Sequence, residues 1–518
     1  MSPAGAARSG ARRPRGADLG IAVALGALQT VTYAHPWTWP LQLACIAGLV
    51  RLAAHCKPAG AALLGLAYGA AWLGAGTWWL YVSLHDYGGL PAALAVLAVA
   101  VLSIGLALYL AGALALWARG RRGRLLPDAL LFAACWLLAE LCRGVIFTGF
   151  PWIASGYAHV DGPLAGYAPW VGVYGMGAIA AALGAAVGLA ERRHLRGPAI
   201  AVGLGLALGV LAGQARFSEP TGTLRVTLLQ GNVPQNEKFA IEHLPETLEW
   251  TRAHLLAAAG DLVVGPETVI PLLPDQLDAD WWNAIVEHFR RGTQAALVGI
   301  PLGNADVGYT NSAVGLSADS ARLPQGRYRY DKHHLVPFGE FVPDGFHWFV
   351  RMMDIPLGDF NRGPLAAPSF EVRGERVGPN ICYEDLFGEE LATRFVDDAR
   401  APTLLANLSN IAWFGRTVAI EQHLQISRLR TLELERPMLR ATNTGATAVI
   451  DHRGVVTAAL EPYTQGTLEG IVQGRRGLTP YARWAGAWGL WPAWIAGALL
   501  ALATFRRTGA AGRGAPLP

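Results

Sequence analysis

Long apolar runs are the feature that most constrains this chain. A helix crosses a bilayer core of about 30 Å with roughly 20 apolar residues. Charged residues make up 15% of this sequence, whereas soluble domains carry about 25%. We therefore predict a multi-pass α-helical membrane domain with eight spans. The candidate spans lie at 18–35, 38–55, 60–82, 90–118, 126–147, 168–190, 197–215 and 484–505.

The N-terminal runs allow two interpretations. Residues 33–40 (YAHPWTWP) separate the first two runs and have the Trp, Tyr and Pro content of an interfacial turn. The alternative is a cleaved signal peptide, which would remove the first run. No convincing small-residue cleavage site follows that run, so the sequence favours a retained first span.

Lysine and arginine occur in every second connection between the predicted spans. The intervening connections, such as 83–90 and 147–167, contain neither residue. Because cationic loops remain in the cytoplasm, we expect both termini (1–17 and 506–518) inside and 220–475 on the periplasmic face of a bacterial inner membrane. The cations are Arg8, Arg12, Arg13, Arg15, Arg51, Lys57, Arg119, Arg121, Arg122, Arg124, Arg192, Arg193, Arg196, Arg506, Arg507 and Arg513.

One pair of opposite charges falls inside a predicted span. Glu140 and Arg143 are three positions apart, so they share a helix face and can neutralise each other. A structural ion pair within the helical bundle is one interpretation. A site for a lipid head group is the other.

Residues 220–475 have the mixed charge of a soluble domain. Runs rich in β-branched and apolar residues alternate there with helical patterns, which favours an α/β layered fold. The expected strands are 224–232, 261–267, 295–301 and 402–410, and the expected helices are 244–259, 279–291, 389–400 and 419–436.

Three chemically useful side chains follow strand-like runs in this domain. Glu267 lies in VVGPET, Lys332 lies in YDKHHLVPFGEFVP with Glu340, and Cys382 lies in NICYED. Each alone has a structural explanation, since a lone cysteine is often a packing residue. Together they form a set for covalent acyl transfer: a thiol nucleophile, a carboxylate base, and an ammonium that lowers the thiol pKa and stabilises an oxyanion.

Other chemistries have little support in the sequence. The chain has five cysteines, and the four besides Cys382 lie in or beside apolar runs, so neither a disulfide nor a zinc site is indicated. His333 and His334 are adjacent, and no metal-ligand spacing occurs, so we predict no metal. A formal net charge of +4 is too small to indicate nucleic-acid binding.

The order Glu267, Lys332, Cys382 resembles that of the carbon–nitrogen hydrolase (nitrilase) superfamily. The surrounding motifs are similar to those of the apolipoprotein N-acyltransferase family over nearly the whole chain. These motifs are GPET, KHHLVPFGEFVP, NICYED, SNIAWFG (409–415), RATNTG (440–445), GAGTWWLYVSLHDYGG (74–89) and FTGFPW (147–152). The resemblance implies a nitrilase-like αββα sandwich joined to eight membrane helices.

The resemblance also implies a reaction and roles for residues. Cys382 would take an acyl chain from a phospholipid such as phosphatidylethanolamine and pass it to the α-amine of a diacylglyceryl-cysteine on an apolipoprotein, the last step of bacterial lipoprotein maturation. Glu267 would be the base and Lys332 the oxyanion partner. The supporting residues would be Glu340, which orients Lys332; Tyr383 and Glu384, which hold the nucleophile loop; and Asn311 and Trp413, which line the site.

The sequence departs from the family pattern at two positions. Phe239 stands where the family often has tryptophan, and Ile411 where an acidic residue is common. Phe239 is nevertheless expected to line the site as a supporting, substrate-binding residue. Both departures concern acyl-chain or lid contacts and leave the reaction type unchanged.

Two other functions are compatible with parts of the sequence. A membrane-tethered amidase that acts on small amides would have the same triad. A transporter could use the outer domain only to bind solute. Eight spans exceed what a tether needs, and the scarcity of charges within the spans argues against a solute pathway.

Overall fold

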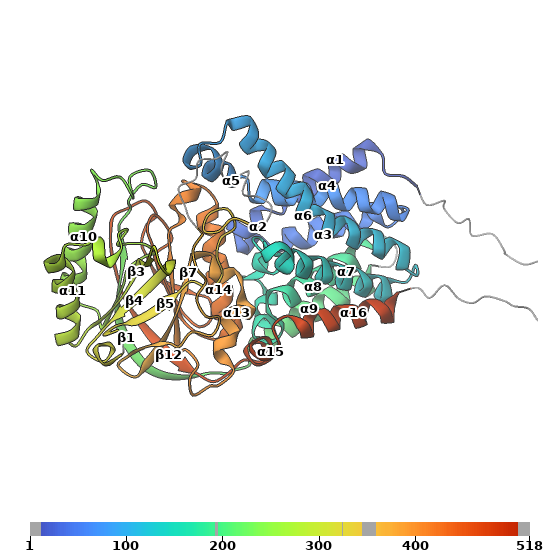
Figure 1. Cartoon of the computed structure of the whole chain (residues 1–518). Helices are drawn as coiled ribbons and strands as arrows, with labels where there is room; N and C mark the ends of the chain where they lie inside the picture. The colour runs from blue at the N-terminus through green and yellow to red at the C-terminus, as the bar shows by residue number, and fades with distance from the viewer. Residues whose placement is uncertain (1–11, 192–194, 324, 344–358, 506–518) are drawn as a thin grey trace, which may run out of the picture.

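The computed structural model describes residues 12–191, 195–323, 325–343 and 359–505. It shows a bundle of helices joined to a domain built from two β-sheets (Figure 1). Six of the cations used to predict orientation lie outside the described residues. They are Arg8, Arg192, Arg193, Arg506, Arg507 and Arg513.

Each predicted span contains helix. Within the described ranges, five helical stretches are long and apolar enough to cross a bilayer, or six if one bent pair counts as a span. The membrane-type helical domain is thus confirmed, whereas the number eight stays a prediction. The helices are α1 (Gly16–Leu28) with α2 (Val31–Ala34), α3 (Trp39–Ala53), α4 (Pro58–Gly76), α6 (Ala92–Gly120), α7 (Leu125–Val145), α8 (Ala168–Gly188), α9 (Arg196–Ala212) and α15 (Pro480–Trp488) with α16 (Trp491–Thr504).

The departures from eight full-length spans have local causes. Helix α3 has 15 residues and α9 has 17, so both are shorter than their apolar runs. The last run is divided because Gly489 adopts φ 55, a left-handed conformation that ends α15. Helix α16 then leaves at 98° to α15.

The cationic end of the bundle lies away from the sheets. Arg121 donates to the carbonyls of Ala53 and Cys56 at 3.3 and 3.1 Å, and Arg122 donates to the carbonyl of Phe505 at 2.7 Å. Figure 1 shows the start of α1 and the end of α16 at this same remote end. The connections rich in cations therefore gather opposite the sheet domain.

The charged pair inside the bundle is structural. Arg143 pairs with Glu140 at 3.1 Å, as the spacing predicted. Its guanidinium also donates to the carbonyls of Phe150 and Trp152 at 2.7 and 2.9 Å, and Glu140 accepts from the backbone N–H of Ser155 at 2.8 Å. These contacts fix the 147–155 segment after α7 and leave the pair buried among protein groups, which favours the structural interpretation over a head-group site.

Two six-stranded sheets form the second domain. The strand orders are β12-β1-β2-β3-β4-β5 and β11-β10-β9-β8-β7-β6. Neighbours are parallel in β1-β2-β3 and β7-β8-β9 and antiparallel elsewhere. The bounds are β1 (Glu219–Gln230), β2 (Leu262–Val264), β3 (Ala295–Asn304), β4 (Gly308–Leu316), β5 (Tyr328–Asp331), β6 (Phe370–Val372), β7 (Glu375–Ile381), β8 (Leu404–Ser409), β9 (Met438–Thr442), β10 (Ala448–Ile450), β11 (Val456–Ala459) and β12 (Gly466–Arg476).

The layers are those of an αββα sandwich. Apolar side chains from both sheets pack against each other in a common core. Helices α10 (Leu244–Ala257) and α11 (Ala279–Arg291) cover the outer face of the first sheet, and α13 (Gly388–Ala392), α14 (Ala419–Leu434) and α15 cover the second. The helix expected at 389–400 is shorter, since α13 ends at Ala392 and continues only as a 3-10 turn, Thr393–Phe395.

Helix α14 joins the sandwich to the bundle. Its residue Gln422 is buried and accepts from the indole N–H groups of Trp79 and Trp152 at 3.0 and 2.7 Å. The same amide donates to the carbonyl of Gly76 at 2.9 Å. Apolar residues of α14 also belong to the core of the bundle, so the two domains share one continuous interior.

Candidate active site

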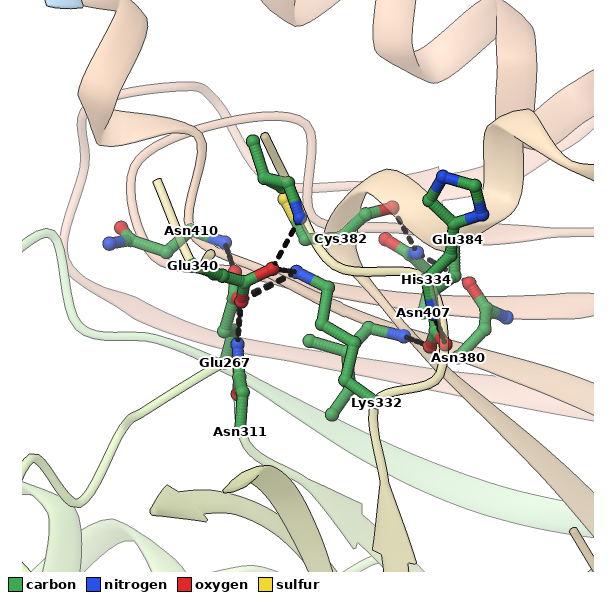
Figure 2. Close-up of polar contacts among 12 residues, drawn as sticks. Glu267, Asn311, Lys332, His334, Glu340, Asn380, Cys382, Glu384, Asn407 and Asn410 are labelled. Carbon is green, nitrogen blue, oxygen red and sulfur yellow. Dashed lines mark hydrogen bonds and ion pairs between the residues drawn. The ribbon is translucent and has the colours of Figure 1, made fainter. Parts of the chain in front are cut away.

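The predicted triad residues follow three strands whose ends meet. Glu267 follows β2, Lys332 follows β5 and Cys382 follows β7. Strands β2 and β5 run in the same direction within the first sheet, so their carboxyl ends lie at one edge. Figure 2 shows the three side chains together with Glu340 and Asn311.

Lys332 lies between two carboxylates. Its ammonium is buried and is 2.9 Å from Glu340 and 3.5 Å from Glu267. Burial lowers the pKa of Lys332, but the two carboxylates outweigh burial and raise it above its ordinary value. Lys332 is therefore charged throughout the physiological range.

Asn311 links the same two carboxylates. Its side-chain amide donates to Glu267 at 2.7 Å and to Glu340 at 2.6 Å, and its backbone carbonyl accepts from the N–H of Lys332 at 2.8 Å. Glu340 also accepts from the N–H of Val336 at 2.8 Å. Asn311 and Glu340 thus fix the positions of Glu267 and Lys332.

Glu267 is held as a carboxylate. Burial raises its pKa, but the charges of Lys332 and Lys238 and hydrogen bonds from Asn311 and Asn410 lower it below its ordinary value. The Asn410 backbone N–H donates to the second carboxylate oxygen at 2.8 Å. An ionised carboxylate beside a thiol is the form that a general base requires.

Cys382 combines a strained backbone with a thiol whose pKa is raised. Its backbone has φ 53, a left-handed conformation that costs an L-residue about 1–2 kcal/mol, and its side chain is partly exposed. Burial and then the charge of Glu267 raise the pKa of Cys382 to about 12, although Lys332 acts in the opposite direction. Lys332 therefore lowers the pKa of Cys382, as expected, but desolvation of the thiol has the larger effect. A thiol in this state reacts as a nucleophile only when a base takes its proton.

Glu384 ties the nucleophile loop to the lysine loop. One oxygen accepts from the N–H of Ile381 at 2.6 Å and the hydroxyl of Tyr330 at 2.7 Å. The other accepts from the N–H groups of His333 and His334 at 2.7 and 3.2 Å. The carboxylate therefore holds the residue before Cys382 and the residue after Lys332.

Tyr383 connects the nucleophile to the helical bundle. Its buried hydroxyl donates to the carbonyl of Gly149 at 3.1 Å, within the FTGFPW segment that Arg143 fixes. Its ring packs against Phe387. The residue next to the candidate nucleophile is thus in direct contact with the membrane-type domain.

A second buried network supports the same loop. Asp385 accepts from His423 at 2.8 Å and from Ser427 at 2.5 Å. Burial raises the pKa of Asp385, but His423 and Arg440 outweigh it and lower the pKa below its ordinary value. Asn407 donates to the Cys382 carbonyl at 3.2 Å, so the strained backbone is held from this side.

Two predicted lining residues lie outside this cluster. The carbonyl of Trp413 accepts from Ser83 at 2.6 Å, and its ring lies edge-on to Tyr87, so Trp413 belongs to the junction with the bundle. The ring of Phe239 is 55% exposed. The structure brings neither ring to the carboxylates, whereas it gathers Glu267, Lys332, Cys382, Glu340 and Asn311. Glu384 and Tyr383 hold the loop that carries Cys382.

Sequence reasoning missed three residues of the site: Asn410, Lys238 and Asn443. Lys238 is buried and donates to the backbone carbonyl of Glu267 at 3.0 Å. Asn443 exchanges hydrogen bonds with Val233 at 3.0 and 2.7 Å. All three lie in motifs that the sequence displays, QGNVPQNEKF, SNIAWFG and RATNTG, but only the fold shows which residue of each motif points inward.

Comparison with known proteins covers both domains. Residues 25–186 match the family described as "Apolipoprotein N-acyltransferase N-terminal domain", and residues 225–481 match "Carbon-nitrogen hydrolase". A protein of Verminephrobacter eiseniae named apolipoprotein N-acyltransferase is 50% identical over 90% of this chain and 92% of its own length. Proteins of the same name from Ralstonia nicotianae and Nitrosomonas europaea are 47% and 40% identical over 95% and 89% of this chain, and over 94% and 92% of their own lengths. The chain belongs to the apolipoprotein N-acyltransferase family.

Proposed function

We propose that this membrane enzyme N-acylates apolipoproteins by way of a thioester on Cys382. The relatives are named for apolipoprotein N-acylation, and an acyltransferase of this class needs an acyl donor and an amine acceptor. The donor that we propose is a phospholipid such as phosphatidylethanolamine. The acceptor is the α-amine of the diacylglyceryl-cysteine at the apolipoprotein N-terminus.

In the first step, Cys382 displaces a lysophospholipid from its acyl chain. Glu267 takes the thiol proton while Sγ attacks the ester carbonyl, and the ammonium of Lys332 stabilises the oxyanion. The C–O ester bond breaks, and Glu267 returns the proton to the departing alkoxide. A thioester and a free lysophospholipid hydroxyl result, and Glu267 is a carboxylate again.

In the second step, the amine takes the acyl chain. Its nitrogen attacks the thioester carbonyl, Glu267 accepts the proton that the nitrogen loses, and the C–S bond breaks. The proton on Glu267 then restores the Cys382 thiol. Both steps need Glu267 to be ionised before it accepts a proton, which is the state that the charges and hydrogen bonds around it favour.

One observation carries this proposal: the hydrogen bond from Tyr383 to Gly149. The residue beside the nucleophile contacts the helical bundle, so acyl chains held at the bundle have a short path to Cys382. A tethered amidase that acts on soluble amides has no need for this contact. Asn311, Glu340 and Glu384 act as positioning residues in this scheme, and Trp413 and Phe239 contribute to the surface that surrounds the entrance.

The proposed setting is the bacterial inner membrane, crossed eight times, with the sandwich (220–475) in the periplasm. Segments 1–17 and 506–518 are cytoplasmic, 18–215 contains seven spans and 484–505 the eighth. The clustering of Arg121 and Arg122 at the end of the bundle remote from the sandwich supports this orientation.

The test compares substrates on the purified protein in detergent micelles. We expect transfer from phosphatidylethanolamine to a diacylglyceryl peptide, no turnover of small amides, and complete loss of transfer in Cys382→Ala. Rapid hydrolysis of small amides without transfer would favour the amidase. Full function of Cys382→Ala in cells that depend on this protein would favour a transporter.

A further inference from the structure

Lys238 is a buried cation that the scheme above leaves without a role. The chain contains three lysines, Lys57, Lys238 and Lys332. Two of the three are buried beside Glu267, one on each side: Lys332 near its carboxylate and Lys238 on its backbone carbonyl. Burying an ammonium is costly unless nearby charge compensates it.

The loop that carries Lys238 is held in place. Asn443 bonds both the N–H and the carbonyl of Val233, and Asn410 donates to the side chain of Gln235 at 2.8 Å. The N–H of Lys238 donates to the carbonyl of Pro234 at 3.0 Å. The ammonium therefore has a defined position rather than that of a surface side chain.

Lys238 adds a second cation beside the two carboxylates that Asn311 links. Glu267 and Glu340 carry two negative charges and share the amide of Asn311. Lys332 supplies one positive charge. Carboxylates that lie close together repel each other, and each cation beside them favours the ionised form. Lys238 places a second cation beside Glu267.

We propose that Lys238 is a positioning residue whose ammonium keeps Glu267 ionised and therefore able to accept the proton of Cys382. This inference rests on the proposed function, since it concerns the base of that reaction. The charge of Lys238 acts on both Glu267 and Cys382, and it is one of the influences that lower the pKa of Glu267.

Other titratable groups also face Lys238. Glu237, His243 and Glu246 line a cavity of about 130 Å³ that Lys238 and Glu267 share. Burial lowers the pKa of Lys238 to about 8, although the charges of Glu267 and Cys382 act to raise it. The lysine is thus mainly charged at neutral pH and loses its charge above pH 8.

The experiment measures the rate at which Cys382 is acylated by phosphatidylethanolamine in micelles, as a function of pH. In Lys238→Met the pKa of Glu267 rises, so we expect the acidic limb of the profile to move up by about one to two pH units. On the acidic side of both limbs, loading should then be lower than in the wild type by about 10- to 100-fold, and the two rates should converge as the pH rises, because Glu267 becomes ionised in either protein.

Three further variants separate charge from structure. Lys238→Gln keeps a hydrogen-bond donor for the Glu267 carbonyl but has no charge. It should therefore shift the acidic limb of the pH profile as Lys238→Met does. It also provides the measurement if the methionine variant fails to fold. Lys238→Arg keeps the charge and should keep the wild-type limb. Lys57→Met, at an exposed position of the bundle, controls for the loss of any lysine.

The inference is overturned if neutral variants have the wild-type profile, or if they lose the same fraction of activity at every pH. The inference would also be overturned if Lys238→Arg shifted the acidic limb of the pH profile as far as the neutral variants do. These outcomes leave acyl loading by the wild type intact. Failure of the wild type to load Cys382 would instead refute the proposed function.

Discussion

Replacing Glu384 by glutamine should separate two loops that the active site needs together. Glu384 accepts four hydrogen bonds, two on each oxygen, from Ile381, Tyr330, His333 and His334. In glutamine an NH₂ group replaces one carboxylate oxygen, so the two hydrogen bonds to that oxygen are lost. The NH₂ group then faces two donors that it cannot pair with. Hydrogen bonds to a charged group contribute about 1.5–3 kcal/mol each, so the loss is about 3–6 kcal/mol.

The same change should reduce catalysis. The lost bonds hold the residues adjoining Cys382 and Lys332, and a displacement of about 1 Å at reacting groups costs about 100-fold in rate. Thermal unfolding in detergent and the rate of Cys382 acylation measure the two effects. Glu390→Gln is the matched control, because Glu390 is more exposed and its single contact with His334, 2.9 Å long, survives in an amide.

The reasoning would be refuted if Glu384→Gln unfolded at the wild-type temperature and loaded Cys382 at the wild-type rate. It would also fail if Glu390→Gln were equally damaging, because the effect would then belong to any carboxylate near His334.

Three other substitutions test separate parts of the structure. Glu267→Gln should abolish acylation of Cys382 while leaving thermal unfolding nearly unchanged, and substantial residual loading would exclude Glu267 as the base. Arg143→Met leaves Glu140 buried and unpaired, which should cost about 3–5 kcal/mol in unfolding free energy; an unchanged melting temperature would contradict the structural interpretation of the pair. Asp385→Asn tests pH dependence: the pKa of Asp385 is lowered in the folded protein, so its stabilisation is present above its unfolded pKa of about 3.9 and is lost as pH falls through the folded value. The stability difference from wild type should therefore be constant from pH 7 to about 5 and shrink in stronger acid, and a difference that grows in acid would reverse the assigned sign.

The sequence predicted the triad because its position depends on local signals. Glu267, Lys332 and Cys382 each follow a short strand, and parallel strands bring such ends to one edge. The alternation of strands and helices predicted an α/β layered fold, and the resemblance to the nitrilase superfamily implied the αββα arrangement of those layers. The strand at 261–267 is shorter than expected, with β2 ending at Val264 before Gly265 and Pro266, since proline cannot donate to a ladder.

The presence of a helical membrane domain was predictable from the sequence, but the number and ends of its helices were not. Apolar composition indicates that a segment is compatible with lipid, but it does not determine where a helix ends. A single residue, Gly489, divides the last run through its positive φ, and α3 and α9 end before their apolar runs do. These ends depend on the backbone conformation of single residues, and the average composition of an apolar window contains no information about it.

The ionisation of the site was also beyond the sequence. Lys332 was expected to lower the pKa of Cys382, yet burial of the thiol outweighs it. Nothing in QGNVPQNEKF distinguishes Lys238 from a solvated lysine until the fold places it against Glu267. Desolvation depends on which surfaces meet, so it appears only with the tertiary structure.

The mass of Cys382 after incubation with phosphatidylethanolamine alone tests the central claim most directly. We predict that the peptide containing Cys382 gains the mass of one fatty acyl group, that hydroxylamine removes this group, and that a diacylglyceryl peptide discharges it. A protein that transfers acyl chains to the acceptor while Cys382 stays unmodified, or whose Cys382→Ala variant still transfers, would contradict the thioester.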